Sequence, residues 1–320
     1  MLYIYNLCLT YNKFELEYFY RVLHFLNFLE LKDTTVQIVH MDFKKNEIVP
    51  NINFIKKPLF ASVYTFSGNG KNSKHEQTVT NINELVSLFT PPKVNGVIVW
   101  VHSGHSNGLY LSKRRNQLFR VEDFCKIVYQ VNNKQKAELI IFDCCLCANI
   151  NCLYVCKFYT NYVIASSSYQ SYLSTMNTNN IYKYRDNTIN YCKGLLKELE
   201  SLEKIDSQAY DTNYNIYKIN DNILVLAKLV LQYKHYFDNK KSFVIDSVKY
   251  KDLECCFSEL GIDINPILDK FVISGRYRKY QCVNKKLSKL KESSIPSKLM
   301  IVLKRPIKKG IQTQGDIFFN

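Results

Sequence analysis

The sequence lacks any run of about twenty uncharged apolar residues, so it predicts no membrane-spanning helix and no membrane partner. Its first residues lack the basic segment followed by an apolar segment that forms a secretory signal. Internal repeats and long low-complexity linkers are also missing. These absences predict a globular protein of the cytoplasm or nucleus.

Acidic residues are scarce, with 28 Asp and Glu against 43 Lys and Arg, which gives a formal net charge of +15. A basic surface of this kind suits nucleic acid. However, the abundance of Lys, Asn, Ile and Tyr is typical of AT-rich coding, which weakens this inference. One basic, aromatic stretch (Arg276, Arg278, Lys279 and Tyr280) would suit RNA or DNA, but no RRM, KH or zinc-finger signature accompanies it. Nucleic acid is therefore not the predicted partner, although a basic nucleic-acid-binding protein remains an alternative.

The cysteines lack the features of a disulfide framework. There are 11 of them, an odd number, and two form the adjacent pair Cys255-Cys256. Paired Cys-x-x-Cys modules are absent, so we predict no metal site. Reduced thiols in a reducing compartment fit this pattern better than disulfides. Five cysteines crowd one stretch: Cys144, Cys145, Cys147, Cys152 and Cys156.

What the chain does contain is a core. Of its 320 residues 47% are hydrophobic and 14% aromatic, which excludes wholesale disorder. Strand patterns alternate with helix patterns up to about Tyr172, which predicts an α/β fold with a mostly parallel sheet between helices. We predict a core of residues 1–185 and a C-terminal extension of residues 186–320 that packs on the same core. The expected strands are Leu2–Leu9, Thr35–Phe43, Phe60–Phe66, Val97–Val101, Ala137–Phe142, Tyr162–Ala165 and, last, Leu299–Leu303.

Two of the expected strands end in residues that carry chemistry. Val97–Val101 runs into His102-Ser103-Gly104-His105-Ser106, and Ala137–Phe142 runs into Asp143-Cys144-Cys145. The carboxyl ends of parallel strands share one edge of the sheet, so Cys145 and a histidine can meet there as nucleophile and acid–base partner. A helix expected from Cys147 to Phe158 would also favour the Cys145 thiolate. The backbone N–H groups of Cys145 and Ser106 are placed to bind an oxyanion.

These motifs resemble those of clan CD cysteine peptidases, the clostripain-like, caspase and metacaspase relatives. Ser103-Gly104-His105-Ser106 is similar to the metacaspase Ser-Gly-His-Gly, and Phe142 to Cys147 is similar to the clostripain Phe-Asp-Ala-Cys-Leu-Met. Tyr162 to Ser167 resembles the strand that follows in the family. The resemblance covers roughly Leu2 to Ser168.

The resemblance implies a caspase-like fold and a cysteine endopeptidase acting on polypeptides. Cys145 is then the nucleophile, His105 its partner, and Asp143 the residue that binds Arg or Lys before the scissile bond. The chemistry needs no cofactor; Ca²⁺ activates some relatives, but no ion site is assigned here. Oligomeric state is not predicted. The serines that flank the substrate cleft are Ser166, Ser167 and Ser168.

Two departures from the family pattern keep alternatives open. Ser106 replaces the glycine that usually follows the histidine, and Asn151 stands where a glutamate is often found, so an inactive interaction protein with the same fold is one alternative. His102 is a second candidate for the catalytic histidine. The run Lys113-Arg114-Arg115, between the two motifs, is a candidate self-cleavage site for a peptidase of basic specificity.

Overall fold

The structure is a computed structural model that describes residues 1–10, 13–42, 59–68, 72–79, 81–92, 96–104, 110–112, 117–118, 121–144, 147–167, 174–184, 186–205, 214–238, 243–245, 248–275 and 300–304. Within these ranges, the chain builds one nine-stranded sheet in the order β13-β10-β9-β8-β5-β1-β2-β3-β4. Its strands are β1 (Leu2–Thr10), β2 (Thr34–Asp42), β3 (Leu59–Ser67), β4 (Ser73–Val79), β5 (Val97–Gly104), β8 (Ala137–Asp143), β9 (Thr160–Ser166), β10 (Tyr214–Lys218) and β13 (Val272–Gly275).

The five central strands of this sheet (β9, β8, β5, β1 and β2) are parallel, and the four outer strands pair antiparallel with their neighbours. β1 is buried at every position because strands lie on both sides of it and helices cover both faces. That is the environment in which a nearly continuous apolar run is stable. The predicted α/β fold with a mostly parallel sheet is confirmed.

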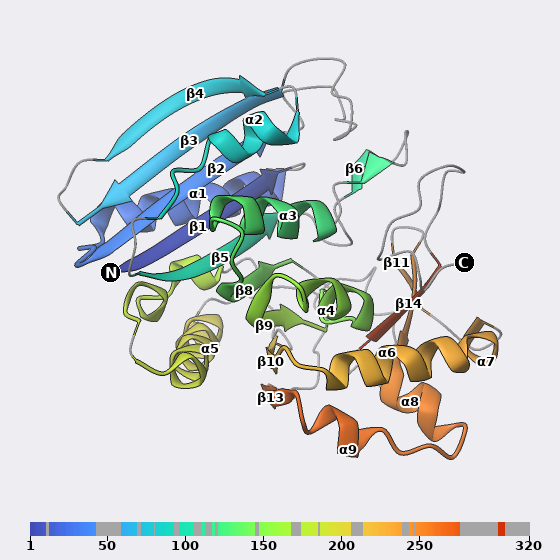
Figure 1. Ribbon diagram of the computed structural model, residues 1–320. Coiled ribbons are helices and arrows are strands. Elements are labelled where there is room, and N and C mark those ends of the chain that lie inside the picture. The colour runs from blue at the N-terminus through green and yellow to red at the C-terminus, as the bar shows by residue number, and fades with distance from the viewer. Residues whose placement is uncertain are drawn as a thin grey trace.

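Helices cover the two faces of the sheet in separate layers (Figure 1). One face packs against α1 (Lys13–Phe28), α5 (Thr188–Ile205) and the short 3-10 turns η1 (Thr175–Asn177) and η2 (Asn180–Tyr182). The opposite face packs against α2 (Ile82–Ser87), α3 (Val121–Val131) and α4 (Ile150–Cys156). The helices α6 (Asn222–Gln232), α7 (Lys234–Asp238), α8 (Leu253–Ser258) and α9 (Asn265–Leu268) belong to the same hydrophobic cluster, in which α6 contacts α4 and α9. None of the described helices is long and apolar enough to cross a membrane.

Alternation along each strand decides which layer a side chain enters. In β5, Val99 and Val101 join the α1 and α5 layer, whereas Trp100 enters the α3 and α4 layer. Trp100 is fully buried there, and its indole Nε1 donates to Oδ1 of Asn132 over 3.1 Å. The same alternation continues to the ends of β5 and β8, where the candidate site lies.

The C-terminal part of the chain corrects one strand assignment. Leu299–Leu303 was expected to be the last strand of the core, but β14 (Met300–Lys304) belongs to a separate three-stranded sheet with β11 (Phe243–Ile245) and β12 (Val248–Asp252). An apolar run identifies a buried strand but not the sheet that it joins. β10 and β13 are the strands through which the C-terminal region extends the central sheet.

Two other elements differ from expectation. The edge strand β4 has an almost wholly polar sequence with six exposed residues, so it carries no hydrophobic pattern. The apolar segment from Asp221 to Phe237 has a helical pattern throughout, but the structure divides it into α6 and α7 at Tyr233. A small hairpin, β6 (Tyr110–Ser112) with β7 (Gln117–Leu118), follows β5 in the chain.

Candidate active site

The site predicted from sequence lies where β5 and β8 end. The two strands are parallel neighbours, with His102 opposite Phe142 and Ser103 opposite Asp143. The structure therefore brings the histidine-bearing and cysteine-bearing strand ends together at one edge of the sheet. The side chains proposed for the chemistry itself lie outside the described residues: His105, Ser106, Cys145 and Ser168.

Asp143 is the last residue of β8, and its side chain enters the α1 and α5 layer. It is 2% exposed and accepts hydrogen bonds from several neutral donors. These are the hydroxyls of Tyr18 in α1 (3.0 Å), Tyr214 in β10 (3.1 Å), Thr175 (2.8 Å) and Ser174, and the backbone N–H of Thr175 (3.0 Å). The carboxylate thus connects three elements that are distant in sequence.

Burial of the Asp143 carboxyl raises its pKa above the usual range, and the hydrogen bonds from Ser174, Thr175, Tyr18 and Tyr214 oppose that rise. Burial disfavours the charged form, whereas donors aimed at the carboxylate favour it. Both oxygens of the Asp143 carboxyl accept hydrogen bonds from these donors. These hydrogen bonds hold the carboxyl in one position at the end of β8.

His102 lies on the opposite face of the sheet, in contact with Cys144. Its Nδ1 is 3.2 Å from Sγ of Cys144, and that thiol also lies 3.2 Å from the carbonyl oxygen of His102, to which it donates. Both side chains are buried, and the imidazole packs 4.9 Å from the ring of Phe124. Burial lowers the pKa of His102 to about 3, so the ring is neutral at physiological pH.

The placement of Cys144 follows from strand alternation. Asp143 and Cys144 point to opposite faces, so the Asp143 side and the His102 side of the sheet are chemically separate. The Cys144 thiol is 2% exposed and belongs to the α3 and α4 core. His102 and Cys144 thus tie the end of β5 to the end of β8 from within that core.

The residues after β8 correct the position of the following helix. We expected it to begin near Cys147, but α4 begins at Ile150, and the Asn149 side chain caps it by accepting from the N–H of Cys152 over 2.9 Å. Asn149 is a favourable N-cap because its side-chain oxygen accepts a hydrogen bond from a backbone N–H of the first helical turn. The helix therefore begins five residues after Cys145 in the sequence rather than two. Asn151 lies buried within α4.

Ser166 and Ser167 lie at the end of β9, next to β8, and both are fully buried. The carbonyl oxygen of Ser166 accepts from the N–H of Ala148 over 2.9 Å. The serine segment and the segment after Cys145 are thus joined by a backbone hydrogen bond.

Sequence reasoning missed the residues that surround Asp143. Tyr18 appears in the sequence as one residue of an amphipathic helix, and Tyr214 is separated from Asp143 by 71 residues. Ser174 begins η1 as its N-cap, with its hydroxyl accepting from Met176 N–H. A Ser-Thr pair after a strand is a recognisable capping signal, but nothing local connects it with a carboxylate in another strand.

The remaining thiols of this region are core residues. Nine cysteines of the described part of the chain are outside any disulfide bond. Sγ of Cys125 in α3 lies 4.0 Å from Sγ of Cys156 in α4, and burial raises the pKa of both thiols. No group of three or more His, Cys, Asp or Glu side chains suited to a metal occurs among the residues that the structure describes.

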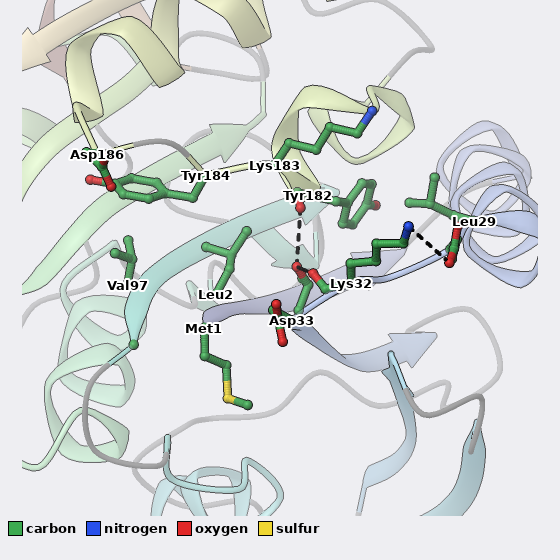
Figure 2. Close-up of a pocket in the computed structure, with 13 residues that line it drawn as sticks. Met1, Leu2, Leu29, Lys32, Asp33, Val97, Tyr182, Lys183, Tyr184 and Asp186 are labelled. Carbon is green, nitrogen blue, oxygen red and sulfur yellow. Dashed lines mark hydrogen bonds and ion pairs between the residues drawn. The ribbon is translucent and has the colours of Figure 1, made fainter.

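A cavity of about 1000 Å³ lies at the other end of the sheet. Figure 2 shows it beside the first residues of the parallel strands, with Met1 just before β1, Leu2 in β1 and Val97 in β5. Asp33, Lys183 and Asp186 also line it. Because it borders the amino ends of strands whose carboxyl ends form the candidate site, this cavity is separate from that site.

Solved structures with the same fold are cysteine proteases. The chain resembles the secreted C11 cysteine protease iotapain from Bacteroides thetaiotaomicron, with a TM-score of 0.60 and 14% identity over 94% of this chain and 93% of the other. It resembles that organism's secreted C11 protease with an irreversible peptide inhibitor (TM-score 0.61, 10% identity, 99% and 95% coverage). An inactive zymogen C11 protease from Parabacteroides distasonis is also similar (TM-score 0.55, 13% identity, 95% and 92% coverage). No protein-family model and no curated protein matches the sequence.

Proposed function

We propose that this protein is a cysteine endopeptidase that hydrolyses peptide bonds after Arg or Lys. The observation that carries the proposal is the pairing of β5 with β8, because the residues next in the chain to their carboxyl ends include His105 and Cys145. The fold shared with C11 cysteine proteases supports it further. The proposed substrate is a polypeptide.

In the proposed reaction the Cys145 thiolate attacks the carbonyl carbon of the scissile bond. The N–H groups of Cys145 and Ser106 stabilise the oxyanion of the tetrahedral intermediate. His105 donates a proton to the leaving amine as the C–N bond breaks, which leaves a thioester on Cys145. Water, deprotonated by His105, then hydrolyses the thioester, releases the new carboxylate and regenerates the thiol.

Asp143 is the proposed anchor for the basic side chain before the scissile bond. It is buried, directly follows the β8 core, and stands two residues before the proposed nucleophile. A carboxylate in such a place attracts a guanidinium or an ammonium group strongly. Ser166, Ser167 and Ser168 are proposed to flank the cleft, since β9 is the neighbour of β8.

The proposed location is the cytoplasm or nucleus. The large number of cysteines, odd in count and without a disulfide pattern, suits a reducing compartment. The reaction as proposed uses no cofactor, and calcium enters only as a condition of the assay.

The test is hydrolysis of reporter peptides that end in Arg or Lys, with and without calcium. Wild type is expected to cleave them, whereas Cys145→Ala and His105→Ala lose at least about 10²-fold in kcat because each removes a chemical step. If His102→Phe keeps activity and His105→Ala loses it, His105 is the acid–base residue. If His102→Phe loses activity and His105→Ala keeps it, His102 is the acid–base residue. A folded wild type that cleaves neither peptide would favour an inactive relative instead.

A further inference from the structure

The hydroxyl of Tyr18 is bonded to the ends of the two strands that lead into the proposed catalytic residues. It donates to Oδ2 of Asp143, the last residue of β8, over 3.0 Å. A second hydrogen bond joins Tyr18 to the hydroxyl of Ser103, near the end of β5. Ser103 in turn donates to Oδ1 of Asn6 in β1 over 3.1 Å. One side chain of α1 therefore connects the end of β5 with the end of β8.

The side chains in this connection are all buried. Ser103, Asn6, Asp143 and Tyr18 are between 0% and 8% exposed. Burial and then the charge of Asp143 raise the pKa of Tyr18 well above its usual range, and hydrogen bonds with Ser103 and Ser174 oppose that rise without cancelling it. The Tyr18 hydroxyl therefore keeps its proton at physiological pH and remains a donor. A buried polar group that loses its partner is costly, so these hydrogen bonds hold the side chains in place.

The connection lies at the last residue pair between the two strands. Ser103 faces Asp143 at the end of the β5–β8 ladder, and among the described residues the ladder goes no farther. Strand ends open more readily than strand interiors, because fewer hydrogen bonds hold them. On the other face of the sheet, the contact between His102 and Cys144 ties the same two ends. Tyr18 supplies the corresponding tie on the α1 face.

The two connected residues stand equally far in sequence from the proposed catalytic pair. Ser103 is two residues before His105, and Asp143 is two residues before Cys145. Attack by a thiolate and proton transfer from an imidazole both require close and correct placement of the two groups, and an error of about 1 Å can cost about 10²-fold in rate. A side chain that fixes the ends of both strands therefore affects the reaction without touching the substrate.

We propose that Tyr18 is a positioning residue of the peptidase reaction and acts through Ser103 and Asp143. Its hydroxyl holds the end of β5 to the end of β8, and so maintains the spacing of the segments that lead to His105 and Cys145. This inference rests on the proposed peptidase function, but it does not require Asp143 to bind the substrate.

The first experiment measures kcat for reporter peptides that end in Lys or Arg. Tyr18→Phe keeps the ring in the core and removes only the hydroxyl, so kcat is expected to fall about tenfold for both peptides, the effect of one hydrogen bond to a charged group. Ser103→Ala removes the other end of the same connection and should cause a similar loss. The double variant should lose no more than either single variant, because all three lack one and the same connection.

A second measurement separates positioning from a general loss of stability. The rate at which iodoacetamide alkylates Cys145 is followed against pH by mass spectrometry of the peptide that contains it. Only the thiolate reacts, and a nearby imidazolium raises the thiolate fraction. In Tyr18→Phe the midpoint of this profile is expected to move up by about one pH unit, which corresponds to the same tenfold effect. A folded variant that is merely less stable would keep the wild-type midpoint.

The matched control is Tyr191→Phe. Tyr191 is also a buried tyrosine in the α1 and α5 layer, but its hydroxyl donates to the Ile181 carbonyl oxygen. This variant is expected to keep the wild-type kcat and alkylation profile.

The proposal is wrong if folded Tyr18→Phe keeps the kcat and the alkylation midpoint of wild type. It is also wrong if the losses of the two single variants multiply in the double variant, because Tyr18 and Ser103 would then act separately. If Tyr18→Phe does not fold, the alkylation midpoint of Ser103→Ala decides the matter. Cleavage of neither peptide by wild type would instead contradict the peptidase function, and the alkylation profiles would still test the connection.

Discussion

At the scale of single residues, burial acts on two titratable groups in opposite directions. His102 and Asp143 lie at the ends of neighbouring strands but on opposite faces of the sheet. Burial lowers the pKa of the imidazole and raises that of the carboxyl, and in both cases the charged form is the one disfavoured. Only Asp143 has a dense set of donors that offsets the cost. The neutral His102 serves as a packing residue bonded to Cys144.

The buried imidazole makes stability depend on pH. In the unfolded chain a histidine binds a proton below about pH 6.5, whereas the folded His102 does so only below about 3. The unfolded state therefore binds more protons in that window, and the free energy of unfolding falls as the pH is lowered, by about 1.4 kcal/mol per pH unit.

The variant His102→Phe tests this dependence, because it keeps an aromatic ring beside Phe124 but removes the titration. Urea unfolding at pH 7, 6 and 5 should show wild type losing about 2 kcal/mol more than the variant by pH 5. Parallel pH profiles for the two proteins would show that the folded His102 binds its proton as readily as the unfolded one.

At the scale of elements, the ends of strands and helices matter more than their interiors. β5 extends to Gly104, three residues beyond the apolar run that predicted it, so His102 lies within the strand and belongs to the core. α4 begins three residues later than expected, since Asn149 caps it. Both boundaries were misplaced because polar side chains at strand ends and caps interrupt the hydrophobic pattern without interrupting the backbone geometry.

The cap of α4 should be measurable. Asn149→Ala removes the acceptor for the Cys152 N–H and is expected to lower the free energy of unfolding by about 1 kcal/mol. Asn149→Ser keeps a capping oxygen and should recover most of that loss. Equal denaturation midpoints for wild type and Asn149→Ala would show that the side chain contributes nothing to the helix.

At the scale of the whole molecule, one continuous sheet joins the N-terminal and C-terminal regions. β10 and β13 extend the parallel sheet beyond β9, and Tyr214 of β10 reaches Asp143 in β8. The C-terminal region is thus part of the candidate site and not an appendage to it. A chain truncated before β10 would lose a hydrogen bond to the Asp143 carboxylate as well as two strands of the central sheet.

Self-cleavage at Lys113-Arg114-Arg115, which lies outside the described residues, is a prediction at this scale. Purified wild type is expected to yield two fragments on a denaturing gel, because a peptidase of basic specificity would find three basic residues between its own motifs. Cys145→Ala should stay at full length. A variant in which Lys113, Arg114 and Arg115 are all replaced by Gln should also stay at full length. Wild type that remains intact while it cleaves a basic peptide would rule out a required cut.

The sequence by itself determined the central strands, because Leu2–Leu9, Val97–Val101 and Ala137–Phe142 are apolar enough to be recognised as the buried strands β1, β5 and β8. It also determined that a histidine and a cysteine follow two of them. Only the tertiary structure decided that β14 leaves the central sheet and that Asp143 is held by Tyr18, Ser174, Thr175 and Tyr214. The physical reason is that local pattern records how much of a side chain is buried, whereas its partners come from segments far away in the chain.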